Sequence, residues 1–308
     1  MNVRILSYNI LLGATRRLEP LSNLIASTQA DIIGLVEATN PHIVEELAKR
    51  LHMDFRITGC GTRPREWHIA VLSRYPILHT HVHTHPETLV RKHMLEVCIE
   101  VPTIGPLTVF VVHLTADFTH GNRGNRLRRR ETETILSIMH AKQGTPHLLM
   151  GDFNTIAPGD KLLASRLLAH LVQVNKQYYD RLGLSYPSYL RKRGILATLR
   201  RLSMRTITAI MLSSPLSKKV LDLISPSFAK GGIDLLKHAG YVDSFRCIHP
   251  RALGFTCFAA APSGRIDYIF ASPEMAPLLT NCDIVLSGNG TYAEQASDHI
   301  PVMADFTI

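Results

Sequence analysis

Carboxylates, amides and histidines recur at five places in this sequence, and we expect each of them at the end of a strand. A polar side chain at the end of a buried strand opens onto a cleft, and site residues of α/β proteins commonly lie at such ends. The five motifs are Ser7-Tyr8-Asn9, Val36-Glu37, Val112-His113-Leu114, Gly151-Asp152-Phe153-Asn154 and Ser297-Asp298-His299, with Arg265-Ile266-Asp267-Tyr268 supporting them. Each alone is an ordinary turn or cap, but their joint order favours a catalytic centre.

These residue types suit metal-assisted hydrolysis of a phosphate ester. Mg²⁺ takes one or two carboxylates and keeps several waters. A base must deprotonate or orient the attacking water, and donors must meet the charge that develops on the phosphoryl group. Glu37 and Asp298 suit the metal, and Asp152 suits the water. The donors available in the five motifs are Asn9, Asn154, His113 and His299.

Strand and helix patterns alternate before the fourth motif, and strands return in the last third of the chain. The expected strands are Val3–Ile10, Asp31–Val36, His68–Ser73, Ile77–His85, Leu95–Val101, Leu107–Leu114, His147–Gly151, Gly254–Phe258, Arg265–Ala271, Asp283–Leu286 and Ile300–Phe306. The expected helices in the first half are Leu18–Ser27, Pro41–Leu51 and Asn125–His140. So many strands for few helices favour a two-sheet sandwich flanked by helices over one parallel sheet.

The ordered motifs SYN, E, LSRYPI, VHL, GDFN, RIDYIF and SDH resemble the endonuclease/exonuclease/phosphatase superfamily, which has the DNase I-like fold. The resemblance runs from Val3 to Phe306, apart from one basic segment. It implies a four-layer α/β/β/α sandwich with the site at one open edge. We expect one domain over residues 1–308 with an insertion at 155–232.

The same resemblance implies a role for each motif residue. Glu37 would ligate Mg²⁺ (Mn²⁺ being possible), with Asn9 nearby and Asp298 in or close to its shell. The scissile phosphate would lie among the remaining motif residues. There Asp152 would orient or deprotonate the water, Asn154 would hold water and phosphate, His299 and His113 would contact the phosphate or act as acid and base, and Asp267 would set the tautomer of His299.

The sequence departs from one branch of this superfamily. Apurinic-site endonucleases carry Gln before the metal-binding Glu and a Lys soon after it, whereas Val36 precedes Glu37 and Ala38-Thr39 follow. That disfavours an apurinic-site specialist. The leading hypothesis is a phosphodiesterase for a nucleic acid, using in-line attack of a water oriented by Asp152. A phospholipid or phosphoinositide phosphodiesterase or phosphatase is the alternative, and a catalytically silent binding module is a third.

The basic character of the chain is concentrated in residues 155–232. This segment has 13 Lys and Arg against 3 Asp, a formal charge of +10 beside +9 for the whole chain. Apolar residues at helical spacing with three arginines predict a helix over Gly194–Leu212, and Leu216–Ile224 a second. Such helices could extend the core, cover the site and meet nucleic-acid phosphates, or contact an anionic membrane through 191–230.

Two further clusters leave alternatives open. His79, His81, His83 and His85 share one face of a strand and could hold a transition metal; we favour a solvated face, because no carboxylate or cysteine accompanies them in the sequence. Arg126 and Arg130 lie one helical turn apart and would bind substrate phosphate if they face the cleft.

Composition sets broad limits. Five scattered cysteines without a CxxC pair argue against a disulfide framework or a zinc site and favour a reducing compartment. No apolar run approaches the roughly 18 residues of a spanning helix, and the N-terminus has a strand pattern rather than that of a signal peptide. We therefore expect a cytoplasmic protein without a transmembrane segment.

Overall fold

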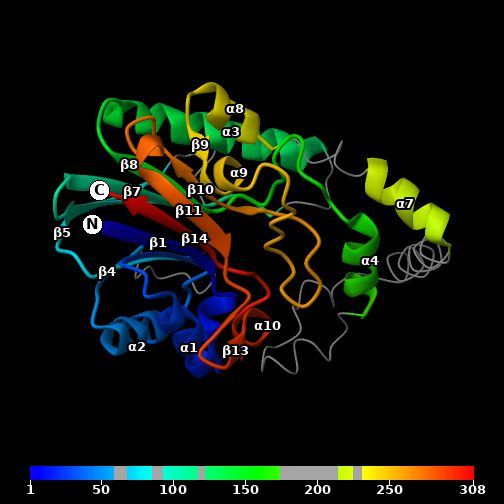
Figure 1. Ribbon diagram of the computed structural model, residues 1–308, viewed down its shortest axis with the longest axis horizontal. Coiled ribbons are helices and arrows are strands. Elements are labelled where there is room, and N and C mark those ends of the chain that lie inside the picture. The colour runs from blue at the N-terminus through cyan, green and yellow to red at the C-terminus, as the bar shows by residue number, and fades with distance from the viewer. Residues whose placement is uncertain (59–67, 85–92, 117–121, 174–213, 225–230) are drawn as a thin grey trace.

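Two six-stranded sheets pack face to face in the computed structural model, with helices on both outer sides (Figure 1). The structure describes residues 1–58, 68–84, 93–116, 122–173, 214–224 and 231–308. Each sheet carries one apolar face toward the other and one toward helices, and this arrangement confirms the predicted α/β/β/α sandwich of the DNase I-like type.

The first sheet has the strand order β11-β14-β1-β2-β4-β3. Only β1 and β2 run parallel in it, and the other neighbours are antiparallel. Its strands are β1 (Asn2–Asn9), β2 (Ile32–Val36), β3 (Asp54–Ile57), β4 (Ile69–Ser73), β11 (Leu279–Ile284) and β14 (Val302–Thr307). Helices α1 (Leu18–Thr28), α2 (Pro41–Leu51) and α10 (Ala293–Ala296) cover its outer face, and β12 (Ser287–Gly288) pairs with β13 (Thr291–Tyr292) beside them.

The second sheet has the order β5-β6-β7-β8-β10-β9, and only β7 and β8 run parallel in it. Its strands are β5 (Ile77–His83), β6 (Met94–Val101), β7 (Gly105–His113), β8 (His147–Asp152), β9 (Val242–Asp243) and β10 (Asp267–Ala271). The helices on this side are α3 (Asn122–Met139), α8 (Ile233–His238) and α9 (Ser244–Ile248). Short 3-10 turns at Leu12–Ala14, His140–Lys142 and Ala276–Leu278 complete the described elements.

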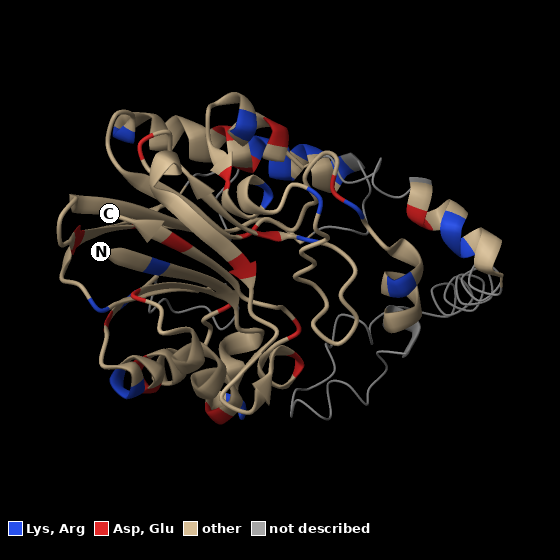
Figure 2. Ribbon diagram, in the orientation of Figure 1, with Lys and Arg blue, Asp and Glu red and all other residues tan. Residues whose placement is uncertain are grey.

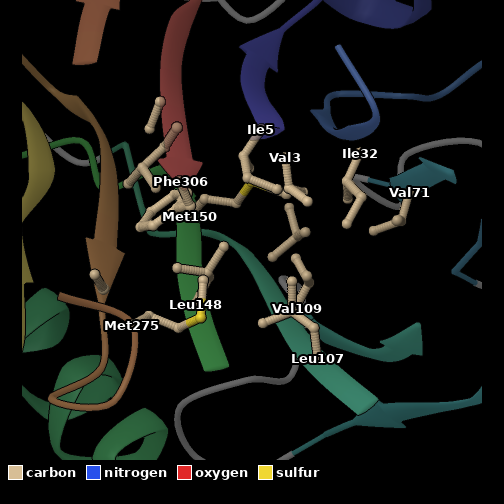
Figure 3. Close-up of a cluster of buried hydrophobic side chains, with 14 of the residues drawn as sticks. Val3, Ile5, Ile32, Val71, Leu107, Val109, Leu148, Met150, Met275 and Phe306 are labelled. Carbon is tan, nitrogen blue, oxygen red and sulfur yellow. The ribbon is translucent and has the colours of Figure 1, made fainter. Parts of the chain in front are cut away.

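The core between the sheets is built from alternate residues of each strand. Val3 and Ile5 from one sheet meet Leu148 and Met150 from the other, and Phe306 packs among them (Figure 3). Because side chains alternate along a strand, the same alternation brings the last residues of β1, β7 and β8 to the faces that meet. The pattern that builds the core therefore also aims Asn9, His113 and Asp152 at one another.

The basic insertion is described only in part. Helices α4 (Ala164–Gln173) and α7 (Pro215–Ile224) lie at one end of the molecule, and basic positions are visible on both and on α3 (Figure 2). The predicted helix Gly194–Leu212 and most of the segment 191–230 lie outside the described residues, so the boundaries 155–232 stay a prediction. No described helix combines the length and the apolar character needed to cross a membrane.

One expected strand is wrong. Within Gly254–Phe258 only Cys257 makes bridges, to Gly264 and His299. The segment is held instead by single contacts: the Ile300 N–H donates to the Thr256 carbonyl at 2.7 Å, and the Ala259 N–H donates to the Asp298 carbonyl at 2.7 Å. Its apolar residues therefore serve to pack this connection against the Ser297-Asp298-His299 motif rather than to extend a sheet.

Candidate active site

Two parallel strand pairs, one in each sheet, bring the polar motifs together. Parallel strands end at the same edge, so Asn9 at the end of β1 lies beside Glu37, which follows β2. In the other sheet His113 pairs with Asp152 across β7 and β8, and Asp152 pairs with Asp267 across β8 and β10. Three of the predicted site residues thus form one row across a single sheet.

Asn9 joins the two sheets at this edge. Its Nδ2 donates to Asp152 Oδ2 at 3.0 Å and to Glu37 Oε1 at 3.3 Å. Its Oδ1 accepts from the Leu11 N–H at 3.0 Å. In this orientation Asn9 presents an amide nitrogen to the carboxylates, so it orients them; serving as an oxygen ligand would require a flipped amide.

Glu37 is held in place by backbone as well as by Asn9. Its Oε2 accepts from the Leu12 N–H at 2.9 Å, and the residue itself has a left-handed φ of 58°. A non-glycine residue in that region is uncommon and is often found at functional sites. The carboxylate that the sequence assigned to the metal is therefore fixed before any ligand arrives.

Asp152 lies at the centre of the cluster and is almost fully buried. Besides Asn9, its Oδ2 lies 3.5 Å from His113 Nε2 and 3.8 Å from His299 Nε2. Its Oδ1 accepts from the Asn154 N–H at 2.8 Å. Potential donors thus surround a carboxylate that can orient a water.

Close contact between β7 and β8 explains the glycine before Asp152. Gly151 lies opposite Val112 with a φ of 139°, and a Cβ there would sit 1.9 Å from the Val112 carbonyl oxygen. Only glycine fits that approach. Asn154, with a left-handed φ of 49°, donates from Nδ2 to the Leu114 carbonyl at 2.9 Å. The GDFN motif is therefore a turn built against the end of β7.

The Ser297-Asp298-His299 motif contacts both sheets. Ser297 Oγ donates to the Asn9 carbonyl at 2.6 Å, and His299 Nδ1 lies 2.9 Å from Asp267 Oδ2. Asp298 Oδ1 lies 4.0 Å from His299 Nε2. The motif thus completes the cluster across the junction of the two sheets.

His299 is set up to carry a proton. Burial alone would lower its pKa, but the carboxylate of Asp267 raises the pKa of His299 well above its ordinary value. Burial also raises the pKa of Cys257 to about 12, so its thiol stays protonated. A charged imidazole at the edge of the cluster can donate toward a phosphate oxygen.

The metal-binding capacity of the cluster lies in its carboxylates. Within the described part of the chain, ligand atoms of Asp152, Asp267 and His299 all come within 4.8 Å of one another. Asp267 already binds His299, whose raised pKa makes it a poor metal ligand. The assignment of Glu37 and Asp298 as Mg²⁺ ligands stays a prediction, and both side chains offer the oxygen atoms that a hard cation prefers.

The two predicted phosphate-binding arginines lie away from these contacts. Arg126 and Arg130 are exposed on α3, and no described contact joins either to the cluster. The buried arginine of this helix is Arg128, which donates to the Thr115 carbonyl at 2.9 Å and to Asn125 Oδ1 at 2.7 Å. Arg128 therefore fixes the segment after β7, while phosphate binding by Arg126 and Arg130 stays a prediction.

Sequence reasoning missed several residues that shape the site. Arg17 is buried and donates to the carbonyls of Ile10, Leu11 and Ala296, which ties the loop after β1 to the residue before Ser297. Nothing in the dipeptide Arg16-Arg17 signals that role. It depends on a partner about 280 positions away along the chain.

The strand expected over Gly254–Phe258 gives no indication of the contacts that Thr256 and Phe258 make. Thr256 Oγ1 accepts from the Ile266 and Asp267 N–H groups at 3.1 and 3.2 Å. The ring of Phe258 contacts His170 of α4 at a centroid separation of 5.1 Å. Thr256 therefore positions the carboxylate that binds His299, and Phe258 anchors the start of the insertion beside the site.

Solved structures with the same fold have low sequence identity to this chain. A 3′ phosphatase, NExo, from Neisseria bound to a product DNA hairpin matches with a TM-score of 0.61 and 19% identity, covering 99% of this chain and 100% of that one. An AP endonuclease from Archaeoglobus fulgidus has a TM-score of 0.62 and 14% identity, with coverage of 99% and 100%. A humanized D. rerio TDP2 matches with a TM-score of 0.60 and 14% identity, covering 100% of this chain and 99% of that one.

The sequence comparisons give a family but no individual relative. No curated protein matches the sequence. The family model of the Endonuclease/Exonuclease/phosphatase family matches residues 6–299, which takes in all of the polar motifs. That family consists of metal-dependent hydrolases that act on phosphoester bonds. The chain belongs to the endonuclease/exonuclease/phosphatase family.

Proposed function

We propose that this hydrolase is a Mg²⁺-dependent phosphodiesterase that acts on a nucleic acid. The observation that carries the proposal is the convergence of Asn9, His113 and His299 on Asp152 Oδ2. The same Asn9 nitrogen also donates to Glu37. A carboxylate set among donors, beside a second fixed carboxylate, suits a reaction in which water attacks a phosphoryl group.

Glu37 and Asp298 would hold the cation. When bound, Mg²⁺ would neutralise the non-bridging oxygens of the phosphate, and Mn²⁺ could replace it because it also prefers oxygen ligands. Asn9 keeps Glu37 and Asp152 at a fixed separation through a single amide group. These residues provide a rigid set of oxygens before substrate enters.

The remaining residues divide the work on water and phosphate. Asp152 would orient the water for in-line attack and accept its proton. Asn154, fixed between Asp152 and the Leu114 carbonyl, would stay close to that water. His299, kept protonated by Asp267, would donate to a phosphate oxygen as negative charge develops there. His113 lies on the other side of Asp152 and would assist at the same phosphate.

A nucleic-acid substrate is supported by charge and by proteins of the same fold. The chain carries a formal charge of +9, which favours a polyanionic partner. Proteins of the same fold include a 3′ phosphatase solved with a product DNA hairpin and an AP endonuclease. The exposed Arg126 and Arg130 on α3 would then contact backbone phosphates.

Purified protein should be tested against DNA, RNA, phosphoinositides, sphingomyelin and small phosphomonoesters with Mg²⁺ or Mn²⁺. We expect cleavage of DNA or RNA, lost in Glu37→Gln and in His299→Gln while the circular dichroism spectrum is unchanged. Arg126→Gln/Arg130→Gln should raise KM for nucleic acid and flatten its salt dependence. Full turnover in both of the first two variants would refute the assigned centre.

A phospholipid headgroup is the second candidate, favoured by one described feature. Leu216, Val220 and Leu223 lie on one face of α7 and are 72%, 50% and 79% exposed, next to Lys218 and Lys219. An apolar face with basic neighbours can rest on an anionic bilayer. Hydrolysis of a phosphoinositide in vesicles, without cleavage of DNA or RNA, would replace the nucleic-acid proposal by this one.

A further inference from the structure

The histidines of β5 have neighbours that the sequence did not place beside them. Leu95, Val97 and Ile99 of β6 point into the core between the sheets, so Glu96 and Cys98 lie on the opposite face of that strand. In the pairing of β5 with β6, His81 lies opposite Glu96 and His79 opposite Cys98. A carboxylate, Glu96, and a thiol, Cys98, therefore lie beside the histidines of β5.

Direct contacts join part of this group. His83 Nε2 lies 2.7 Å from Glu96 Oε2, and the rings of His81 and His83 are 4.4 Å apart between centroids. The other oxygen of Glu96 lies 2.9 Å from Lys142 Nζ. Both oxygens of Glu96 are therefore engaged, one by His83 and one by Lys142.

We propose that His81, His83 and Glu96 bind one divalent transition-metal ion, Zn²⁺ being the best fit. Imidazole nitrogen and carboxylate oxygen are both zinc ligands, at about 2.0–2.1 Å and 2.0–2.2 Å. The ion replaces the hydrogen bond between His83 and Glu96, and water completes its coordination. Hard cations such as Mg²⁺ do not select such a nitrogen-rich set.

Binding requires the side chain of His81 to move, because among the described residues the ligand atoms that lie within 4.8 Å of one another are those of Asp152, Asp267 and His299. Two imidazoles sharing a tetrahedral ion lie about 5 Å apart between centroids, given metal–nitrogen bonds of about 2.0–2.1 Å. The observed 4.4 Å is close to this separation, and His81 is exposed and can change its rotamer. Cys98 pairs with His79 rather than with His81 or His83, so it is left out of the ligand set.

This site is distinct from the catalytic cluster. His113 follows Val109 and Val111 on the face of the second sheet that looks toward the first sheet, whereas Glu96 lies on the outer face. Strand β5, which carries His81 and His83, is also the edge strand of that sheet. Binding of Zn²⁺ would fasten this edge strand to β6 by way of Glu96.

Zinc titration of the full chain by calorimetry in excess Mg²⁺ tests the proposal. We expect the wild type to bind one Zn²⁺ more than His81→Ala/His83→Ala does. The matched control His42→Ala/His238→Ala removes two exposed histidines elsewhere and should bind as the wild type does. Glu37→Gln should keep this ion, which separates it from any zinc at the catalytic cluster.

Glu96 and Lys142 distinguish a built site from chelation by surface histidines. Glu96→Gln should weaken zinc binding at least tenfold, and Lys142→Gln should tighten it severalfold, because the lysine competes for the carboxylate. An unchanged zinc stoichiometry in His81→Ala/His83→Ala would overturn the proposal. So would equal zinc affinity in wild type, Glu96→Gln and Lys142→Gln, since only adventitious binding to exposed rings would then remain.

Discussion

Replacing Arg265 by methionine should destabilise the protein by about 3–5 kcal/mol, the usual effect of removing one partner of a buried ion pair. The guanidinium is 1% exposed. It donates from Nη1 and Nη2 to the two oxygens of Asp243 at 2.8 and 2.7 Å and from Nε to Asp160 Oδ2 at 2.8 Å. Its carbon Cζ lies 4.4 Å from the centroid of the Tyr268 ring.

The size of the expected destabilisation follows from the hydrogen-bond partners that Asp160 and Asp243 retain in the variant. Asp160 still accepts from Arg246 Nη2 at 2.8 Å, so its charge remains paired. Asp243 keeps the Arg246 backbone N–H at 3.1 Å but loses its bidentate partner inside the protein. The expected loss therefore corresponds to one broken buried pair rather than two. Adding Asp243→Asn removes the stranded charge and should restore part of the stability.

Urea unfolding followed by far-ultraviolet circular dichroism gives the free energy of unfolding of each variant. Arg166→Met is the matched control: Arg166 is exposed and donates to the Pro262 carbonyl at 2.9 Å, and its loss should change stability by no more than about 0.5 kcal/mol. A loss below about 1 kcal/mol for Arg265→Met, or no recovery on adding Asp243→Asn, would refute the assignment of an unpaired buried charge.

Other predictions concern the cluster itself. Arg17→Gln should lower kcat more than it raises KM, because the loop that holds the metal-side residues loses its attachment; steady-state kinetics checks this. Asp267→Asn should lower the pKa of His299, so the alkaline limb of a pH–rate profile moves to lower pH. The ion pair between His299 and Asp267 gives its full stabilisation below the unfolded-state histidine pKa of about 6.5, and this stabilisation is lost as pH rises through the raised pKa of folded His299. Thermal melts across this pH range test the expectation. Gly151→Ala should force the strand away from Val112 and cost at least about 1–3 kcal/mol in the same unfolding assay.

The order of motifs and the family resemblance predict that the polar motif residues lie in one site, and the structure places Asn9, Glu37, His113, Asp152, Asp267 and His299 in contact or adjacent to one another. Asn9, His113 and Asp152 each end a strand whose alternate residues are apolar, and that alternation decides which face they point from. Parallel pairing then places Asn9 beside Glu37 and His113 beside Asp152, because parallel strands end at one edge. The alternation is legible in the sequence, whereas the parallel pairing of β1 with β2 and of β7 with β8 comes from the structure.

Contacts between distant segments were not legible in this way. Arg17 reaches the carbonyl before Ser297, and Thr256 binds the backbone of Asp267, through connections that have no periodic pattern. The same holds for His83, whose carboxylate partner Glu96 comes from the next strand in the sheet. In each case the partner depends on how elements pack, which residue type and local spacing do not encode.

The catalytic geometry is therefore a property of the sheet-to-sheet core. One sheet supplies Asn9, the other supplies Asp152, and the 3.0 Å hydrogen bond between them spans the junction. Asn9 and Glu37 lie at the edge of the first sheet, and His113, Asp152 and Asp267 lie in the second, so the cluster needs both sheets. Ser297 and His299 sit across the same junction, bonded to opposite sheets. Packing at residues such as Met150 (Figure 3) thus sets the distance on which the proposed chemistry depends, although that side chain makes no polar contact with the site.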